Sequence, residues 1–247
     1  MSASVGTSAV APARVLGLLA RDLPPDRLST DPRTLAAHCT DRSGTRPDGL
    51  PLAVVHARRV QDVGTVLRHA HSLGVPVVPR GAGTGLSGGA SAGEGSLVLD
   101  LSGMDRVLEL DAEDQLAVVE AGVVTADLDR AAGAHGLRYA PDPASAAWST
   151  IGGNIATNAG GLRCAKYGVT RDSVLGLEAV LADGTVVRTG RRTVKGVTGY
   201  DLTALLTGSE GTLAVITSAT LRLRPVPVAS ATLAAWFASF EAAARAS

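Results

Sequence analysis

The sequence is poor in cysteine and in aromatic residues, has no net charge and contains no long apolar run. Its two cysteines, Cys39 and Cys164, lie far apart and form no metal-binding or redox motif, which favours a reducing, cytoplasmic location. The 23 basic residues balance the 23 acidic ones, so no basic face for nucleic acid is expected. Aromatic residues form 3% of the chain, too few for stacking on single strands. No apolar run is long enough to predict a membrane span.

Glycine, in contrast, is abundant and concentrated in a few segments. Residues 76–89 read Pro-Val-Val-Pro-Arg-Gly-Ala-Gly-Thr-Gly-Leu-Ser-Gly-Gly. Glycine lets a backbone turn sharply and approach a ligand closely, at a cost in conformational entropy. Backbone N–H groups in such a loop can bind a diphosphate, and Arg80 is the only positively charged residue in the stretch. We interpret the segment as a loop that holds the pyrophosphate of a nucleotide cofactor; a tight connection without a ligand is the alternative.

Two other phosphate-binding motifs fit this stretch less well. Gly83-Thr-Gly-Leu-Ser-Gly88 matches G-x-G-x-x-G, but that fingerprint needs a helix to begin within the loop. The next residues, 89–96, are a poor helix former, and an apolar strand is predicted directly after them, over Leu97–Leu101. A P-loop would need Gly-Lys followed by Ser or Thr, and the stretch lacks it.

The first part of the chain, residues 1–49, is expected to be a tail and a helical arm without a clear core of its own. Residues 1–12 are small and uncharged, lack the basic start of a secretory signal, and predict a loose tail. Apolar spacing predicts short helices over Arg14–Leu23 and Thr34–Cys39. Residues 40–51 are rich in Asp, Gly and Pro and are expected to be irregular.

Regular elements begin near residue 50. A strand, an amphipathic helix ended by Gly74 and a second strand predict a β-α-β unit that leads into the glycine loop: Leu52–His56, Val60–Leu73 and Val75–Val78. Further patterns predict hairpins across Asp111–Asp114 and Asp183-Gly184. Two helices are predicted, one capped by Thr125 and ending near His135 and one over Leu202–Leu206. A turn over Gly208–Gly211 leads into a predicted strand over Thr212–Leu223.

Residues 139–168 form a long segment dominated by Gly, Asn, Ala, Ser and Thr. Long segments without regular structure inside compact domains are usually functional or disordered. Small apolar residues alternate here with amide side chains, so we favour an ordered wall against a ligand, with disorder as the alternative.

The last residues predict a helix over Leu233–Ala244, directly after Pro225 and Pro227. Because nothing follows for this helix to pack against, we expect residues 228–247 to be the start of a truncated domain. A terminal helix that packs back on the core is the alternative.

Three glycine-containing motifs stand in one order: Arg80-Gly-Ala-Gly-Thr-Gly-Leu-Ser-Gly-Gly89, Ile151-Gly-Gly-Asn-Ile-Ala-Thr-Asn-Ala-Gly-Gly161 through Lys166-Tyr-Gly168, and Thr207-Gly-Ser-Glu-Gly-Thr-Leu-Ala-Val-Ile-Thr217. Together they resemble the FAD-binding (PCMH-type) domain of the vanillyl-alcohol oxidase/p-cresol methylhydroxylase superfamily. The residues of the three motifs are most similar to the branch that holds the glycolate oxidase flavoprotein subunit, D-lactate dehydrogenase and D-2-hydroxyglutarate dehydrogenase. The resemblance covers about Leu50 to Pro227.

The resemblance implies an α+β fold of two subdomains, about 50–102 and 103–227, with FAD between them and a C-terminal cap (substrate) domain that this chain lacks. It implies that the first motif wraps the pyrophosphate, that the second lines the adenosine and isoalloxazine, and that the third approaches the nucleotide. The residues concerned are Arg80, Gly81, Ala82, Gly83, Thr84 and Gly85; Pro141, Asp142, Thr150, Gly152, Gly153, Ala156, Asn158, Gly160 and Gly161, with Tyr167 and Gly168 closing the wall; and Glu210, Val215 and Ile216.

Some of these assignments have structural alternatives. Glu210 is either an acid that accepts ribose hydroxyls or a solvated turn residue, and Tyr167 is either part of the wall or a core aromatic. Some family members attach FAD through a histidine after the loop arginine, and the corresponding residue here is Thr84, so we expect non-covalent FAD.

No catalytic residue and no metal site can be assigned from the sequence. His69 and His71 are two apart on a predicted helix and face different sides, and His38, His56 and His135 are isolated. The resemblance places the catalytic histidines in the cap. Arg163 and Lys166 are the nearest candidate cations for a substrate carboxylate, or else solvated loop charges.

The leading interpretation is the FAD-binding portion of an oxidoreductase that oxidises a small 2-hydroxy acid, glycolate or D-lactate, with an iron–sulfur or other electron-accepting subunit as a candidate partner. The alternatives are a relative acting on sugars, aldonolactones or alkyl-glycerone phosphates, and a flavin-binding subunit or fragment without turnover of its own. A nicotinamide Rossmann protein is disfavoured.

Overall fold

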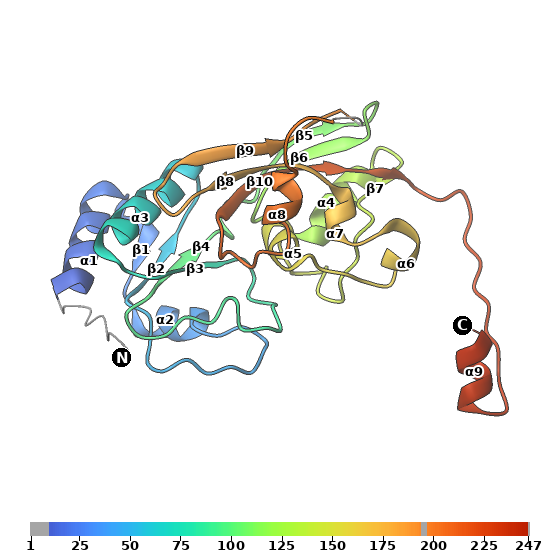
Figure 1. Cartoon of the computed structure of the whole chain (residues 1–247), viewed down its shortest axis with the longest axis horizontal. Coiled ribbons are helices and arrows are strands. Elements are labelled where there is room, and N and C mark those ends of the chain that lie inside the picture. The colour runs from blue at the N-terminus through green and yellow to red at the C-terminus, as the bar shows by residue number, and fades with distance from the viewer. Residues whose placement is uncertain (1–9, 194–196, 247) are drawn as a thin grey trace.

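The computed structural model describes residues 10–193 and 197–246, so the predicted tail lies largely outside the described residues. Two β-sheets stand side by side, each with helices packed against it (Figure 1). The first, of order β1-β2-β4-β3, contains β1 (Leu28–Ser29), β2 (Ala53–His56), β3 (Val77–Arg80) and β4 (Leu97–Asp100). The second, of order β5-β6-β10-β8-β9, contains β5 (Val107–Asp111), β6 (Leu116–Glu120), β8 (Val174–Val180), β9 (Val186–Gly190) and β10 (Val215–Arg222). The predicted α+β fold of two parts is confirmed.

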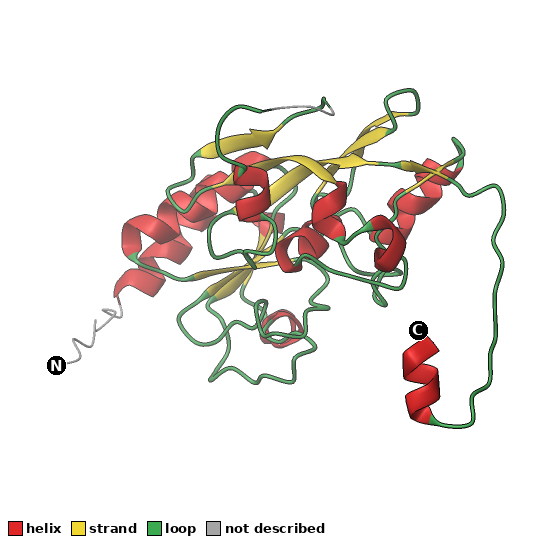
Figure 2. Ribbon diagram, turned by 45° about the vertical axis from the view of Figure 1, so that its right-hand side comes forward, coloured by secondary structure: helices red, strands yellow, loops and turns green. Residues whose placement is uncertain are grey.

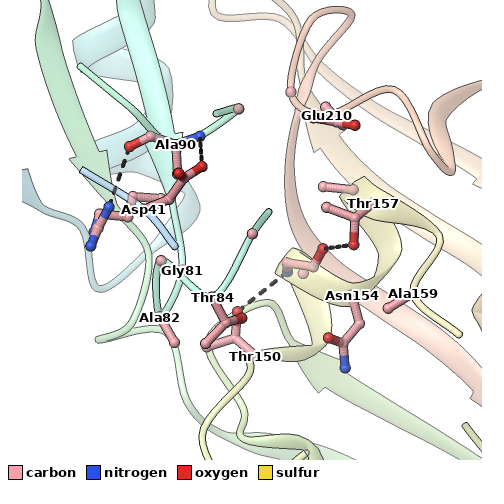
Figure 3. Close-up of a pocket in the computed structure, with 18 of the residues that line it drawn as sticks. Asp41, Gly81, Ala82, Thr84, Ala90, Thr150, Asn154, Thr157, Ala159 and Glu210 are labelled. Atoms are coloured by element: carbon pink, nitrogen blue, oxygen red, sulfur yellow. Dashed lines mark hydrogen bonds between the residues drawn. The ribbon is translucent and has the colours of Figure 1, made fainter. Parts of the chain in front are cut away.

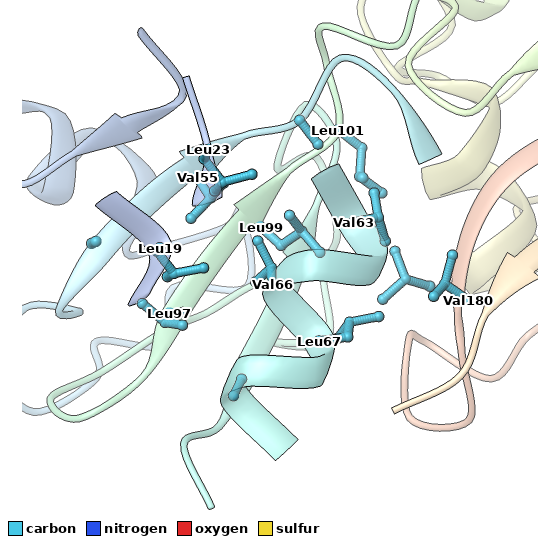
Figure 4. Close-up of a cluster of buried hydrophobic side chains, with 14 of the residues drawn as sticks. Leu19, Leu23, Val55, Val63, Val66, Leu67, Leu97, Leu99, Leu101 and Val180 are labelled. Carbon is cyan, nitrogen blue, oxygen red and sulfur yellow. The ribbon is translucent and has the colours of Figure 1, made fainter. Parts of the chain in front are cut away.

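The first sheet is parallel along β2, β4 and β3, as the predicted β-α-β unit requires. Helix α3 (Val60–Leu73) connects β2 to β3 and ends at Gly74, whose φ of 66° is readily adopted by glycine. Its apolar face meets the sheet, where Val63, Val66 and Leu67 pack against strand residues (Figure 4). Each buried side chain of this size contributes about 1.5–3 kcal/mol.

The N-terminal segment completes this core. Helix α1 (Val10–Asp22) packs on α3, and Leu19 is fully buried in the same cluster (Figure 4). A short 3-10 helix, η1 (Pro25–Arg27), leads into β1, which pairs with β2. Helix α2 (Pro32–His38) begins at Asp31, which caps it by accepting from the Thr34 N–H, and covers the opposite face of the sheet. The division at residue 50 stays a prediction: α1 packs in the core that contains α3, and α2 packs on the other face of the same sheet.

The second sheet is antiparallel, with β10 at its centre between β6 and β8. Both predicted hairpins are confirmed, the second turning at Gly184 with φ 84°. Its core is formed by Leu177, Ile216 and Leu221 with residues of helix α5 (Ile151–Thr157). A two-stranded ribbon, β7 (Leu137–Arg138) with β11 (Arg224–Pro225), extends one end.

One local prediction is incomplete and another is wrong. Residues 139–168 are ordered, as favoured, but they contain regular structure, namely α5 and α6 (Cys164–Tyr167), and α7 (Thr170–Ser173) follows. Thr125 does not cap helix α4 (Thr125–Gly133): Val124 precedes the helix, and the Thr125 hydroxyl donates to the Ser149 carbonyl at 2.9 Å. Helix α8 (Leu202–Leu206) lies where it was predicted and is capped by Asp201.

The end of the described chain stands apart from the sheets. Helix α9 (Phe240–Ala246) begins later than the predicted Leu233, and the segment before it is extended and exposed (Figures 1 and 2). Leu233 and Trp236 are about nine-tenths exposed, at 91% and 89%. Among the helices of residues 10–193 and 197–246, none has the length and apolar character of a membrane span.

Candidate functional site

A cleft of about 560 Å³ lies between the two sheets, within the range of cofactor sites. Its lining comes from four separate segments, at residues 41–42, 79–90, 143–160 and 210–216, together with Leu101. Figure 3 shows Gly81, Ala82 and Thr84 on one side of it, with Thr157 and Glu210 facing them from the other.

The glycine loop presents unpaired backbone donors to the cleft. Within the described ranges, the N–H groups of residues 81–89 donate no hydrogen bond to a protein acceptor. Gly83 and Gly88 have φ values of 65° and 86°, a conformation that costs other residues energy. A row of free N–H groups on a sharply turned backbone is a binding site for anionic oxygen atoms. The loop therefore fits a pyrophosphate.

Arg80 supports this loop from beneath. Its guanidinium is buried, with 9% of the residue exposed, and donates to the carbonyls of Thr40 and Ala90 at 2.7 and 3.3 Å. Burial lowers the pKa of Arg80, while the nearby carboxylates of Asp100 and Asp41 oppose that effect. A Cβ on Gly83 would lie 2.2 Å from the guanidinium, so only glycine lets the loop cross over it.

Asp41 holds the far end of the same loop. Its carboxylate accepts hydrogen bonds from the Ser43 and Ala90 N–H groups at 2.9 and 3.3 Å (Figure 3). Partial burial opposes ionisation of Asp41, but the hydrogen bonds from Ser43, Ala90 and Ser91 outweigh it and lower the pKa. The irregular segment predicted over 40–51 is thus a support for the cofactor loop.

Helix α5 forms the opposite wall. It begins at Thr150, whose hydroxyl accepts from the Gly153 N–H, and ends at Asn158 in the left-handed conformation. A Cβ on Gly152 would lie 2.6 Å from the Ala121 Cβ, so the glycine lets the helix pack closely on the sheet. Asn154 is buried and donates to the Thr125 hydroxyl at 2.6 Å. These contacts fix the helix against the second sheet.

Three glycines allow the two halves to approach one another across the cleft. A Cβ on Gly81 would lie 2.2 Å from the Thr150 hydroxyl, and one on Gly89 would lie 2.7 Å from the Glu210 carboxylate. On the opposite side of the cleft, a Cβ on Gly211 of the second half would lie 2.5 Å from the Pro79 ring of the first half. Glycine at these places sets the width of the cleft.

Most of the predicted cofactor residues line the cleft. Those that do are Arg80, Gly81, Ala82, Gly83, Thr84, Gly85, Thr150, Gly152, Gly153, Ala156, Asn158, Gly160, Glu210, Val215 and Ile216. Glu210 has a φ of 51° and its N–H donates to the Ala156 carbonyl at 2.8 Å, which brings its turn against α5.

The remaining predicted residues lie outside this lining: Pro141, Asp142, Gly161, Tyr167 and Gly168. A Cβ on Gly161 would clash with the Asp142 carbonyl at 2.1 Å, and Gly168, with φ 83°, ends α6.

The two candidate substrate cations also lie outside the lining of the cleft. Arg163 pairs with Asp129 and Asp142 at 3.5 Å, and Lys166 lies over the ring of Tyr167.

Several cleft residues were missed by the sequence analysis. Arg42 lies 5.1 Å from the ring centre of Trp148, a cation–π contact that joins the N-terminal segment to the second half beside the cleft. Trp148 is 47% exposed. No motif surrounds Asp41, Arg42 or Trp148, and the fold alone brings them to the site.

His38 and His56, predicted to be isolated, lie together with Asp100 outside the cleft lining. Their rings meet edge to face, with centroids 5.6 Å apart. The prediction that these two histidines are isolated is therefore wrong.

Two α+β halves around a cleft with an anion-binding loop define a nucleotide-cofactor domain, and the family comparison agrees. Residues 51–190 match the family model described as FAD binding domain, so the chain belongs to that family and its cofactor is FAD. It is 49% identical over 196 residues to glycolate oxidase subunit GlcD of Bacillus subtilis, covering 79% of this chain and 42% of that protein. It is 51% identical over 172 residues to D-lactate dehydrogenase of Archaeoglobus fulgidus, covering 70% and 38%.

Solved structures support the fold. The chain superposes on p-cresol methylhydroxylase with a TM-score of 0.78 and 22% identity, over 91% of this chain and 45% of that one. The predicted membership of an FAD-binding family, with glycolate oxidase and D-lactate dehydrogenase among its relatives, is confirmed. The chain spans less than half the length of these relatives.

Proposed function

We propose that the chain is the FAD-binding portion of a flavin-dependent oxidoreductase that oxidises a small 2-hydroxy acid, of the glycolate or D-lactate type, to the 2-oxo acid. The observation that carries this proposal is the cleft, whose loop of free N–H groups faces a helix wall. The substrate class comes from the names of two relatives that are about 50% identical to this chain over the aligned residues.

Each part of the cleft has a proposed role. The N–H groups of residues 81–89 bind the pyrophosphate, and Arg80 holds their backbone in shape. Glu210 accepts ribose hydroxyls, while Val215 and Ile216 give an apolar cover that excludes water. When bound, FAD supplies the acceptor for the hydride that leaves C2 of the hydroxy acid. Thr84 offers no ring nitrogen for attachment, so the cofactor is non-covalent.

Turnover is proposed for a protein of the relatives' full length. The chain spans less than half the length of its relatives. This favours a second candidate function, a flavin-binding portion without turnover of its own. The catalytic base and the group that binds the substrate carboxylate are then supplied elsewhere, and an electron-accepting subunit is the proposed partner.

The two tryptophans provide a direct test of FAD binding. Trp148 lines the cleft and Trp236 lies in the exposed C-terminal segment. In a Trp236→Phe variant, adding FAD should quench the remaining fluorescence, and in the matched Trp148→Phe variant it should not. Equal quenching in both, or no uptake of FAD, contradicts the cofactor site.

Substrate class and attachment need two further measurements. Anaerobic D-lactate or glycolate should bleach the yellow chain if it carries its own catalytic groups, whereas an unbleached yellow chain supports the second candidate. After denaturing electrophoresis the protein band should show no flavin fluorescence, and a fluorescent band contradicts non-covalent binding.

A further inference from the structure

A polar cluster lies on the α2 face of the first sheet, at the carboxyl ends of its parallel strands. Register places His56 of β2 beside Asp100 of β4, which in turn lies beside Arg80 of β3. Since side chains alternate along a strand, these residues share the face on which Val54 and Val98 pack against Leu35. The cluster is thus separate from the α3 core.

Asp100 is a fixed and buried carboxylate. Only 4% of it is exposed, and it accepts hydrogen bonds from the Ser102 N–H at 2.9 Å and the Ser102 hydroxyl at 3.0 Å. The same carboxylate lies 2.7 Å from His56 Nδ1. Arg80, on the neighbouring strand, donates to backbone carbonyls and not to this carboxylate, so the partners of Asp100 are Ser102 and His56.

His38 approaches from the end of α2. Its Nδ1 lies 2.8 Å from the Thr34 carbonyl, which can only accept, so Nδ1 carries the proton and Nε2 keeps a lone pair. One donor atom from each of His38, His56 and Asp100 lies within 4.8 Å of the other two. Two imidazoles and a carboxylate therefore converge on one position.

We propose that His38, His56 and Asp100 form a binding site for a divalent transition-metal ion of the Zn²⁺ type. Imidazole nitrogen and carboxylate oxygen are the ligands that such ions prefer, whereas Ca²⁺ and Mg²⁺ take oxygen ligands alone. The ion takes the place of the proton between His56 and Asp100. Ligand bonds of about 2 Å require the His56 Nδ1 and the Asp100 oxygen, which are 2.7 Å apart, to separate slightly, and the half-buried His38 to rotate inward from its Thr34 contact.

The position gives the ion a structural effect. It would fasten α2 to β2 and β4, and the residues directly after His38 hold the cofactor loop. The Cys39 carbonyl accepts from the Ala92 N–H at 2.9 Å, and the Thr40 carbonyl accepts from Arg80. The site therefore lies behind the cofactor loop, and it strengthens the loop's support without touching the cleft.

The test uses the chain without a polyhistidine tag, titrated with Zn²⁺ by calorimetry and with Co²⁺ by visible absorption. One ion should bind per chain, and His38→Gln should weaken binding by at least about tenfold. The matched control is His71→Gln, because His71 is an exposed histidine outside the cluster, and it should leave binding unchanged. No saturable binding, or equal loss in both variants, overturns the proposal.

A second variant guards against a failure to fold. Asp100 is buried whereas His38 is half-buried, so a substitution at His38 should disturb the fold less than one at Asp100. Circular dichroism tests whether the His38→Gln variant is folded. If it does not fold, His56→Gln replaces it in the same titrations. Loss of the cobalt absorption in His56→Gln, with retention in His71→Gln, supports the site, and retention in both overturns it.

Discussion

Single glycines allow the close packing that shapes the cofactor cleft, and Gly152, which lets α5 pack on the second sheet, shows this most directly. An alanine there would place its Cβ 2.6 Å from the Ala121 Cβ and 3.0 Å from the Ala121 carbonyl oxygen. Because neither atom belongs to a flexible side chain, we expect Gly152→Ala to lower the free energy of unfolding by about 1–3 kcal/mol. Urea denaturation measures the change.

Gly17 provides the control for Gly152. It lies in α1, is exposed, and a Cβ there would meet nothing within 4 Å. Gly17→Ala should raise the free energy of unfolding by about 0.5–1 kcal/mol through helix propensity. A similar effect of both substitutions would mean that close packing at Gly152 is unimportant.

Asp41 makes the cofactor loop sensitive to acid. Its pKa is lowered in the folded chain from an ordinary value of 3.8, so its contribution to stability is full above that value. The contribution is lost as pH falls through the lowered pKa. Asp41→Asn should cost about 1–3 kcal/mol at neutral pH.

The pH dependence separates Asp41 from a general charge effect. In urea titrations, the difference in the free energy of unfolding between the unaltered chain and Asp41→Asn should become smaller as pH falls below 3.8. The control is Asp48→Asn, which removes an exposed negative charge from the same segment. A gap that stays constant into acid would show that ionised Asp41 does not hold the loop.

Among the secondary-structure elements, helix α5 depends on its C-terminal residue. Asn158 has φ 48° and ψ 52°, and its side-chain oxygen accepts from the Arg171 N–H at 2.9 Å. Asn158→Gly loses only this hydrogen bond, whereas Asn158→Ala also strains the backbone. The alanine variant should therefore be less stable than the glycine variant by about 1–2 kcal/mol in chemical denaturation. Equal stabilities would show that the conformation costs alanine nothing here.

Elements that are determined by their own residues could be predicted from the sequence, whereas elements that depend on tertiary packing could not. Helix α3 and hairpin β8–β9 follow from apolar period and turn residues, so the sequence placed them well. Helix α5 was missed because Gly152-Gly153 disfavours a helix in isolation, and the packing against Ala121 that requires Gly152 is a tertiary contact.

The same distinction holds within the site. The glycine loop was predicted from its own residues, and the free N–H groups agree with that interpretation. Asp41 and Trp148 reach the cleft through tertiary contacts that leave no local pattern. Likewise the His38–His56 contact depends on the packing of α2 against β2, which spacing along the chain does not reveal.

At the scale of the whole molecule, a protease should cut the described chain first where it is exposed, in the segment before α9 and at surface positions such as Tyr200, and not in the buried cores. The exposed segment before α9 contains Leu233, Trp236 and Phe237, whereas Tyr139 is fully buried. Brief chymotrypsin treatment should cut in the exposed segment and spare Tyr139, as mass spectrometry of the products would show. Cleavage after Tyr139 at a comparable rate would contradict the packing described.

The place of β10 also bears on how the protein is synthesised. β10 is the last strand of the second sheet to leave the ribosome, yet it lies at the centre, between β6 and β8. Until it is translated, the two hairpins expose unpaired edges that are prone to aggregation. Glu210 and Ile216 complete the cleft only at this late stage. The edges of β6 and β8 must therefore stay unpaired until β10 emerges, and cofactor loading follows the completion of the sheet.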